Sequence, residues 1–275
     1  MTYKTILVQL DIDQPATPRT AFAWALAKRF GAELIAFCAC QPQQVMSAGE
    51  GAMVGDVLMR RQIEEIEARF RDLKEEVRQA TEDNALVSWR GLVEMPTRSL
   101  LEQARAADLI VTGTVGPEFF RNTHRTIDPG ELILAAGRPV LFANIRPAPL
   151  TAERAVVSWK DTREARRAIA DAMPFLVGAK EVVVATAQEG DPTEARASLA
   201  DVVGHLTRHG VKARSEILFP VDGEIGLAVS SAAFELGADL VVSGGYGHSR
   251  LREWTFGGVT RSLLHDGSLN RLFSN

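Results

Sequence analysis

The sequence predicts an α/β fold in which two doubly wound, parallel five-stranded sheets follow one another as a tandem repeat. Two observations support this prediction. Short runs of β-branched and apolar residues alternate with amphipathic helical segments, which is typical of parallel βαβ units. The same order of segments also occurs twice, because ADLIVTGTVG at 107–116 matches ADLVVSGGYG at 238–247 almost residue for residue. Such self-similarity indicates a duplicated unit.

Each half begins with a short apolar run, TILVQLD at 5–11 and RAVVSWK at 154–160. An Ala-rich amphipathic helix follows in each half, and then a second strand-like run, ELIAFCAC at 33–40 and EVVVATAQ at 181–188. These runs lack strict alternation, which favours strands buried on both faces. Each half should therefore read β-α-β-α-β-α-β-α-β. The next helix of the first half carries an apolar stripe at helical spacing: Ile63, Ile66, Phe70, Leu73 and Val77.

A Pro-containing segment, NIRPAPLTAE at 144–153, marks the boundary between the repeats. We expect a first repeat at 1–147 and a second at 152–275.

Composition excludes several classes of protein. The 275 residues carry a formal net charge of -4, which argues against nucleic acid as a partner, because that binding needs clustered Lys and Arg. No apolar run approaches the roughly 20 residues that span a bilayer, so no membrane partner is expected. The N-terminus enters a strand-like run directly, which leaves no room for a signal peptide. With only two cysteines and no disulfide framework, we expect a cytoplasmic protein.

Two pairs of residues raise the question of a metal site. Cys38 and Cys40 share one face of a strand, but no further ligand lies at zinc-like spacing, so buried structural thiols are favoured. His205 and His209 lie four residues apart on an expected helix, again without a third ligand. A solvated helix face is the preferred interpretation, and no metal site is predicted.

The stretch GGYGHSRLREWTFGGVT at 244–260 has glycines at both ends. Such glycines serve either close packing of a strand against a helix or a cradle of backbone N–H groups for phosphate. The stretch leaves the fourth strand of the second half and enters a helix that starts near Gly258. Ligands of open parallel sheets bind at the carboxyl ends of strands, and helix N-termini hold anions. The position therefore suits a polyphosphate.

The spacing of Gly244, Gly247 and Gly257 resembles the nucleotide loop of the universal stress protein family, which reads Gly, two residues, Gly, nine residues, Gly, then usually Ser or Thr. Gly258 stands where Ser or Thr is usual. The resemblance covers both halves and implies a tandem universal stress protein that binds ATP or another adenine nucleotide, with or without Mg. It implies these nucleotide-binding candidates in the second half: Ser158, Trp159, Lys160, Asp161, Gly244, Gly247, His248, Gly257, Gly258, Val259 and Thr260.

The resemblance also bears on assembly, because members of the family commonly pair through their last strands. It implies that PVLFA at 139–143 and RLFS at 271–274 lie side by side and make an internal pseudo-dimer with a pseudo-two-fold axis. Such pairing would cover two sheet edges that otherwise invite aggregation. The sequence leaves open whether the whole chain also forms a homodimer.

The first half departs from the family's glycine pattern. Gly113 and Gly116 keep the opening pair. After nine intervening residues, Thr126 stands where the pattern has its third glycine, and the next glycine is Gly130. Pro129, in the same loop, has no N–H to give. We therefore expect the phosphate loop of the first repeat to be degenerate.

The first strand shows the opposite asymmetry. Asp11 matches the family's ribose-binding aspartate, whereas the second half has Lys160, followed by Asp161 where glycine is usual. An ammonium group cannot accept a hydrogen bond from a ribose hydroxyl. Each half thus keeps one part of the family's site. We predict binding mainly in the second repeat, with Asp11, Gly113 and Gly116 as weaker candidates.

The sequence favours a non-catalytic stress-response protein. It contains no GxxxxGK[ST] motif, and His248 has no identifiable nucleophile or orienting partner that would make it a general base. Arg250 and Arg252 are as consistent with solvated loop charges as with phosphate contacts. Two alternatives stay open: an interaction protein of the same fold that works without nucleotide, and a slow ATP hydrolase.

Overall fold

The computed structural model describes residues 2–43, 52–114, 122–144, 148–188, 193–246 and 258–275. The elements of the first half are β1 (Thr5–Gln9), α1 (Thr17–Phe30), β2 (Glu33–Ala39), α2 (Ala52–Ala80), β3 (Val87–Leu92), α3 (Pro96–Gln103), β4 (Leu109–Gly113), α4 (Pro129–Ala135) and β5 (Val140–Ala143). Those of the second half are β6 (Arg154–Ser158), α5 (Arg163–Leu176), β7 (Glu181–Ala187), α6 (Thr193–Arg208), β8 (Ala213–Leu218), α7 (Ile225–Leu236), β9 (Leu240–Gly244), α8 (Gly258–His265) and β10 (Asn270–Ser274). Each half therefore has the predicted alternation of strands and helices.

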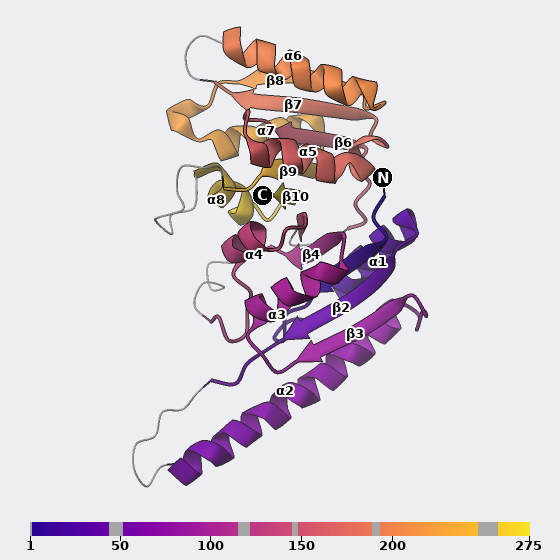
Figure 1. Ribbon diagram of the computed structural model, residues 1–275, viewed down its shortest axis with the longest axis vertical. Coiled ribbons are helices and arrows are strands. Elements are labelled where there is room, and N and C mark those ends of the chain that lie inside the picture. The colour runs from indigo at the N-terminus through magenta and orange to yellow at the C-terminus, as the bar shows by residue number, and fades with distance from the viewer. Residues whose placement is uncertain (1, 44–51, 115–121, 145–147, 189–192, 247–257) are drawn as a thin grey trace.

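The strands form one continuous sheet in the order β3-β2-β1-β4-β5-β10-β9-β6-β7-β8 (Figure 1). All pairs within a half are parallel, and β5 and β10 pair antiparallel at the centre, with Leu272 opposite Leu141. The expected pairing of the two last strands is confirmed. The two five-stranded sheets are thus joined into a single ten-stranded sheet with an internal pseudo-two-fold, and the joint leaves neither of these edges bare.

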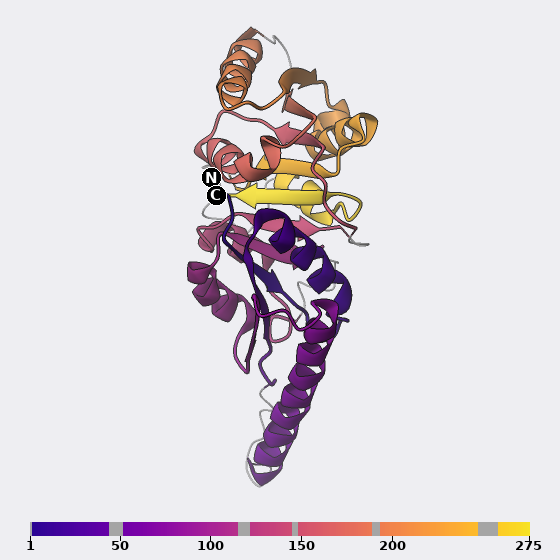
Figure 2. The same cartoon turned by 90° about the vertical axis from the view of Figure 1, so that its right-hand side faces the viewer.

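Helices cover both faces of the sheet (Figure 2). The strands alternate between the two faces: Ile6 and Val8 of β1 belong to the apolar core under α1, α2, α5 and α6, whereas Leu7 belongs to the core under α3, α4, α7 and α8. This burial on both faces explains why the strands are apolar without strict alternation. Four of the five residues of the predicted α2 stripe are buried: Ile66, Phe70, Leu73 and Val77.

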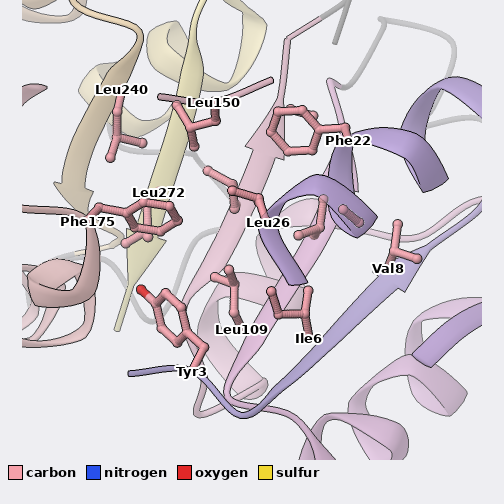
Figure 3. Close-up of a cluster of buried hydrophobic side chains, with 14 of the residues drawn as sticks. Tyr3, Ile6, Val8, Phe22, Leu26, Leu109, Leu150, Phe175, Leu240 and Leu272 are labelled. Carbon is pink, nitrogen blue, oxygen red and sulfur yellow. The ribbon is translucent and has the colours of Figure 1, made fainter. Parts of the chain in front are cut away.

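Apolar contacts cross the joint between the halves on both faces. On one face, the rings of Phe30 and Phe175 meet edge to face at 5.2 Å between centroids. Tyr3 lies beside Phe175 (Figure 3), and its hydroxyl donates a hydrogen bond to the carbonyl of Asp171. On the other face, Phe142 and Phe273 stack edge to face at 5.8 Å. Because these contacts join α1 to α5 and β5 to β10, the two halves share the apolar core on each face of the sheet.

Glycine terminates two of the helices. Gly31 after α1 and Gly237 after α7 have φ values of 62° and 65°, in the left-handed region that glycine adopts without a Cβ penalty. Each returns its backbone N–H to the last turn of its helix. The chain is thereby turned directly into β2 and β9. No helix among the described residues is long and apolar enough to cross a membrane.

Candidate functional site

The second half brings several predicted residues to the carboxyl edge of its parallel strands. Ser158 ends β6 and pairs with Ser243 on the neighbouring strand β9, directly before Gly244. Lys160 follows β6 and is exposed, and its carbonyl accepts a hydrogen bond from the amide of Thr162 at 2.7 Å. Thr162 caps α5 by accepting from the amide of Ala165. The strand end and the helix cap thus hold Lys160 at the edge.

Asp161 and Trp159 are engaged by other parts of the protein. The Asp161 carboxylate pairs with Arg166 of α5, with 2.5 Å between Oδ1 and Nη2. Both side chains are mostly exposed, so the pair is solvated and can exchange partners. The Trp159 side chain is buried in the core, and its indole N–H donates to Ser198 Oγ at 2.9 Å. Trp159 therefore offers a ligand its backbone rather than its ring.

Gly244 and Gly258 stand in different surroundings. A Cβ on Gly244 would lie 2.6 Å from the backbone nitrogen of Ala165 and 2.8 Å from the carbonyl carbon of Glu164, so glycine is needed for close packing of β9 on α5. At Gly258, a Cβ would have no neighbour within 4 Å among the described residues, and the residue does not have the positive φ that demands glycine. Of the two explanations for glycine, packing thus accounts for Gly244, whereas no described residue packs closely enough on Gly258 to require glycine there.

The helix α8 begins at Gly258, as predicted. It connects two parallel strands, β9 and β10, so it runs back from the carboxyl edge and its N-terminus lies toward that edge. Val259 is half-buried and Thr260 is buried. The remaining candidates of this loop, Gly247, His248 and Gly257 with Arg250 and Arg252, lie outside the described residues, as does Gly116 of the first half.

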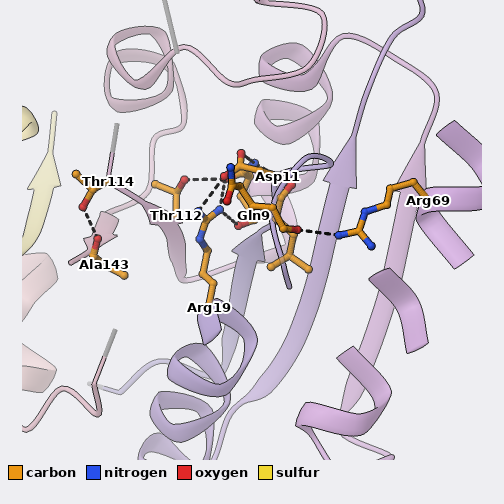
Figure 4. A network of polar contacts seen from close by, with 9 residues as sticks. Gln9, Asp11, Arg19, Arg69, Thr112, Thr114 and Ala143 are labelled. Carbon is orange, nitrogen blue, oxygen red and sulfur yellow. Dashed lines mark hydrogen bonds and ion pairs between the residues drawn. The ribbon is translucent and has the colours of Figure 1, made fainter. Parts of the chain in front are cut away.

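In the first half, Asp11 belongs to a buried polar network (Figure 4). Its Oδ2 pairs with Nη2 of Arg19, from the first turn of α1, at 2.9 Å. Gln9 donates from Nε2 to Oδ1 of Asp11 at 3.0 Å and accepts from the Thr112 hydroxyl at 2.7 Å. Arg19 also donates to the carbonyl of Gln9. The carboxylate expected to bind ribose is therefore occupied by an arginine of the same chain.

Arg19 also covers Gly113 at the end of β4. A Cβ on Gly113 would lie 2.0 Å from Nη2 of Arg19, so the guanidinium occupies the space that the missing side chain leaves. Asp11 and Gly113 are thus brought together, as the family pattern implies, but with Arg19 between them. Arg19 was not among the site residues predicted from the sequence. Nothing in the sequence marks it for this role, because an arginine in the first turn of an amphipathic helix usually faces solvent.

A cavity of about 350 Å³ lies in the first half, beside this network. Its lining includes Ile12, Gln41, Arg69, Asn122 and Arg125. The cations are matched by carboxylates: Arg125 pairs with Asp13, and Arg69 with Glu76 at 2.9 Å. The hydrogen bonds from Arg125 lower the pKa of Asp13, which keeps that carboxylate ionised. Because the charges are balanced, the cavity has little net attraction for phosphate.

The two residue pairs considered for metal binding have structural surroundings. Cys38 and Cys40 are free, buried thiols in one core, as expected from their position on one strand face. His205 and His209 are exposed at the end of α6, with their ring centroids 4.7 Å apart. Within the described part of the chain, no three His, Cys, Asp or Glu side chains are grouped as a metal site requires.

The fold is that of a tandem, doubly wound α/β protein. Residues 2–125 match the model of the universal stress protein family. The first half of the chain therefore carries a domain of this family, and the second half repeats the same order of strands and helices. No curated protein matches the sequence.

Solved structures match both halves together. A universal stress protein from Archaeoglobus fulgidus DSM 4304 aligns with a TM-score of 0.70 at 14% identity, over 98% of this chain and 96% of that one. A putative universal stress protein from Pseudomonas aeruginosa UCBPP-PA14 aligns with a TM-score of 0.62 at 17% identity, over 99% and 93% of the two chains. At such identities the similarity establishes the shared fold.

Proposed function

We propose that the protein is a stress-response protein that binds ATP or a related adenine nucleotide at the carboxyl edge of its second half and performs no chemistry on it. The match of residues 2–125 to the universal stress protein family supports the stress-response role. The observation that carries the location is Gly258, a glycine that neither its backbone conformation nor packing against the described residues requires. A glycine at a helix start lets a phosphate approach the free N–H groups of the first turn.

The first half is less suited to an anionic ligand than the second, which supports the same location. Arg19 occupies the space between Asp11 and Gly113, so a ribose there must displace a buried ion pair. The neighbouring cavity has its arginines matched by carboxylates. In the second half Lys160 is exposed after β6, where a phosphate at the same edge would meet a cation. The asymmetry therefore favours the second half for an anionic ligand.

The residues present fit a phosphate chain better than a ribose. Lys160 and the first turn of α8 supply positive charge and N–H donors. The Asp161 carboxylate would accept from ribose hydroxyls once released from Arg166, an exchange that costs little because both side chains are mostly exposed. A magnesium ion would then be held chiefly by the nucleotide's own phosphates, with Asp161 as the nearby carboxylate.

Isothermal titration of the whole chain with ATP, ADP and AMP tests this proposal. We expect heat of binding, with an affinity that decreases from ATP to AMP, because the phosphates make most of the contacts. Gly258→Val should weaken ATP binding at least about tenfold by placing a branched side chain over the helix start. Lys160→Ala should weaken ATP more than AMP. Gly178→Val, at an exposed glycine beyond the opposite end of α5, is the matched control and should leave affinity unchanged.

Two results would overturn the proposal. Absence of heat and of any thermal shift at millimolar nucleotide would leave the alternative of a nucleotide-independent interaction protein, which the packing role of Gly244 favours. Binding that is insensitive to Gly258→Val but lost in Asp11→Asn would place the site in the first half. The absorbance near 260 nm of the protein as purified adds an independent check, since a tightly held nucleotide raises it.

A further inference from the structure

Two helices occupy corresponding places in the two halves. α3 precedes β4 and α7 precedes β9, and both cover the same face of the sheet. They bury residues with the same spacing, i, i+3 and i+7: Thr97 and Leu100 on α3 with Ala104 in the 3₁₀ turn (104–106) that follows it, and Gly226, Val229 and Ala233 on α7. The duplication therefore provides an internal comparison, because the matching buried positions identify which exposed positions correspond.

The exposed rows of these helices differ in chemistry. Along α3 and the 3₁₀ turn that follows it, the row beside the buried stripe is charged and consists of Arg98, Glu102 and Arg105, with an ion pair between the first two. On α7 the corresponding row consists of Leu227, Ser231 and Phe234. Leu227 is 61% exposed and Phe234 is 84% exposed. Leu227 and Phe234 lie two turns apart on the same side of α7, and exposed apolar side chains that are grouped in this way are typical of a surface that another molecule covers.

Two further exposed apolar residues precede α7 in the chain. Phe219 and Val221 are 68% and 78% exposed, in the connection from β8 to α7. We name these two residues, together with Leu227, Ser231 and Phe234, the α7 row. Its length fits a helix lying across it, because Leu227 and Phe234 are separated by about two helical turns, or roughly 10 Å.

The charges along the α7 row are acidic. Asp222 and Glu224 stand between Val221 and Leu227, Glu235 follows Phe234, and all three are exposed. The sequence contains no Lys or Arg from residue 215 to residue 249. The Arg154 guanidinium lies near Gly237, beyond the end of the row. An apolar surface with an acidic rim is complementary to a ligand that is apolar on one side and basic around it.

We propose that the α7 row is a docking surface for a basic amphipathic helix of a partner protein. Such a helix would place its apolar face on Leu227 and Phe234 and its Lys or Arg side chains against Asp222, Glu224 and Glu235. A second copy of this chain fits less well, because a two-fold contact would bring acidic rims together. An anionic membrane surface would be repelled by the same carboxylates. The surface lies on a helix that carries none of the proposed nucleotide contacts, so it is independent of that function.

Fluorescence anisotropy with the whole chain and a labelled model peptide tests the docking surface. The probe is a helical peptide of about 18 residues made only of Leu and Lys, with leucines at positions i, i+3, i+4 and i+7. We expect it to bind, and a peptide of the same pattern with Glu for Lys to bind at least tenfold more weakly. The double variant L227R/F234R, which gives α7 the charges that α3 carries, should reduce affinity for the Lys peptide at least tenfold.

Two controls accompany the double variant. Val57→Arg changes another exposed apolar residue, on α2, and should leave affinity unchanged. Circular dichroism melting should give the same midpoint for L227R/F234R as for the natural chain, because both positions are exposed. Equal binding of the Lys and Glu peptides, or binding that survives L227R/F234R, would overturn the proposal. So would self-association in sedimentation velocity, or binding to phosphatidylserine vesicles, that L227R/F234R abolishes, because the row would then serve a second copy or a membrane.

Discussion

Arg19 and Asp11 form an ion pair whose side chains are only 17% and 5% exposed. Removing one partner of such a pair leaves the other charge in a poorly solvated place, which costs about 3–5 kcal/mol when burial is complete. We expect Arg19→Ala to lower the free energy of unfolding by about 3 kcal/mol in urea denaturation. Arg61→Ala, which breaks an exposed pair with Glu65, should cost less than about 1 kcal/mol. Equal losses in the two variants would show that Arg19 is not the structural occupant of this edge.

The two buried thiols, Cys38 and Cys40, should make the stability of the protein depend on pH. Burial raises the pKa of Cys38 and of Cys40 above the ordinary value for a thiol. A thiol of the unfolded chain ionises near pH 8.5, whereas the buried thiols of the folded protein stay protonated at that pH. The free energy of unfolding is therefore unaffected by the thiols below that pH and decreases as the pH rises above it, because ionisation favours the unfolded chain. We expect the urea midpoint to fall between pH 7 and pH 9.5, and the fall to be smaller in the Cys38→Ala/Cys40→Ala variant. Native protein should not react with Ellman's reagent at pH 7, and rapid reaction would contradict the burial.

At the scale of elements, the ends of β4 and β9 contact the first turns of α1 and α5, the helices that follow the neighbouring strands β1 and β6. Gly244 of β9 lies against the backbone of α5, whereas Gly113 of β4 lies against a side chain of α1. A backbone contact cannot be relieved without moving the helix, but a side chain can be displaced or removed. The same glycine position thus has a different physical origin in each half.

A double-mutant cycle tests this difference. Gly113→Ala should destabilise the natural chain by displacing Arg19, but should cost little in the Arg19→Ala background. Gly244→Ala should destabilise by about 1–3 kcal/mol in either background, and Gly258→Ala should change stability by less than about 0.5 kcal/mol. Urea denaturation of the variants gives these values. Additive effects of Gly113→Ala and Arg19→Ala would contradict the contact.

At the scale of the whole molecule, the joint between the halves contains a buried charge. The Arg271 side chain on β10 is fully buried, and burial lowers its pKa to about 10, so it stays charged at neutral pH. Its Nη2 donates to Thr114 Oγ1 at 2.7 Å, which ties the second half to the end of β4. Among the described residues, its Nε and Nη1 have no hydrogen-bond partner. The joint therefore contains a group that costs free energy to bury.

Replacing this arginine should not weaken the joint. We expect Arg271→Met to leave the melting temperature unchanged or to raise it, because an apolar side chain of similar length avoids the desolvation cost. Thr114→Val should instead lower stability by about 1–3 kcal/mol, since it leaves the buried charge with one partner fewer. Thermal denaturation of both variants provides the measurement. A larger loss in Arg271→Met than in Thr114→Val would mean that the charge itself stabilises the joint.

The two-fold repetition and the order of strands and helices are predictable from the sequence alone, because both follow from local patterns that a single chain displays. The pairing of β5 with β10 follows from the resemblance to the universal stress protein family, and the need to cover two sheet edges supports it. The groups that occupy the strand ends follow only from how the elements pack together. Arg19 fills the space over Gly113, the α5 backbone fills the space over Gly244, and no described residue fills the space over Gly258. Such occupancy depends on the separation of elements that are far apart in sequence, and no local pattern encodes that separation.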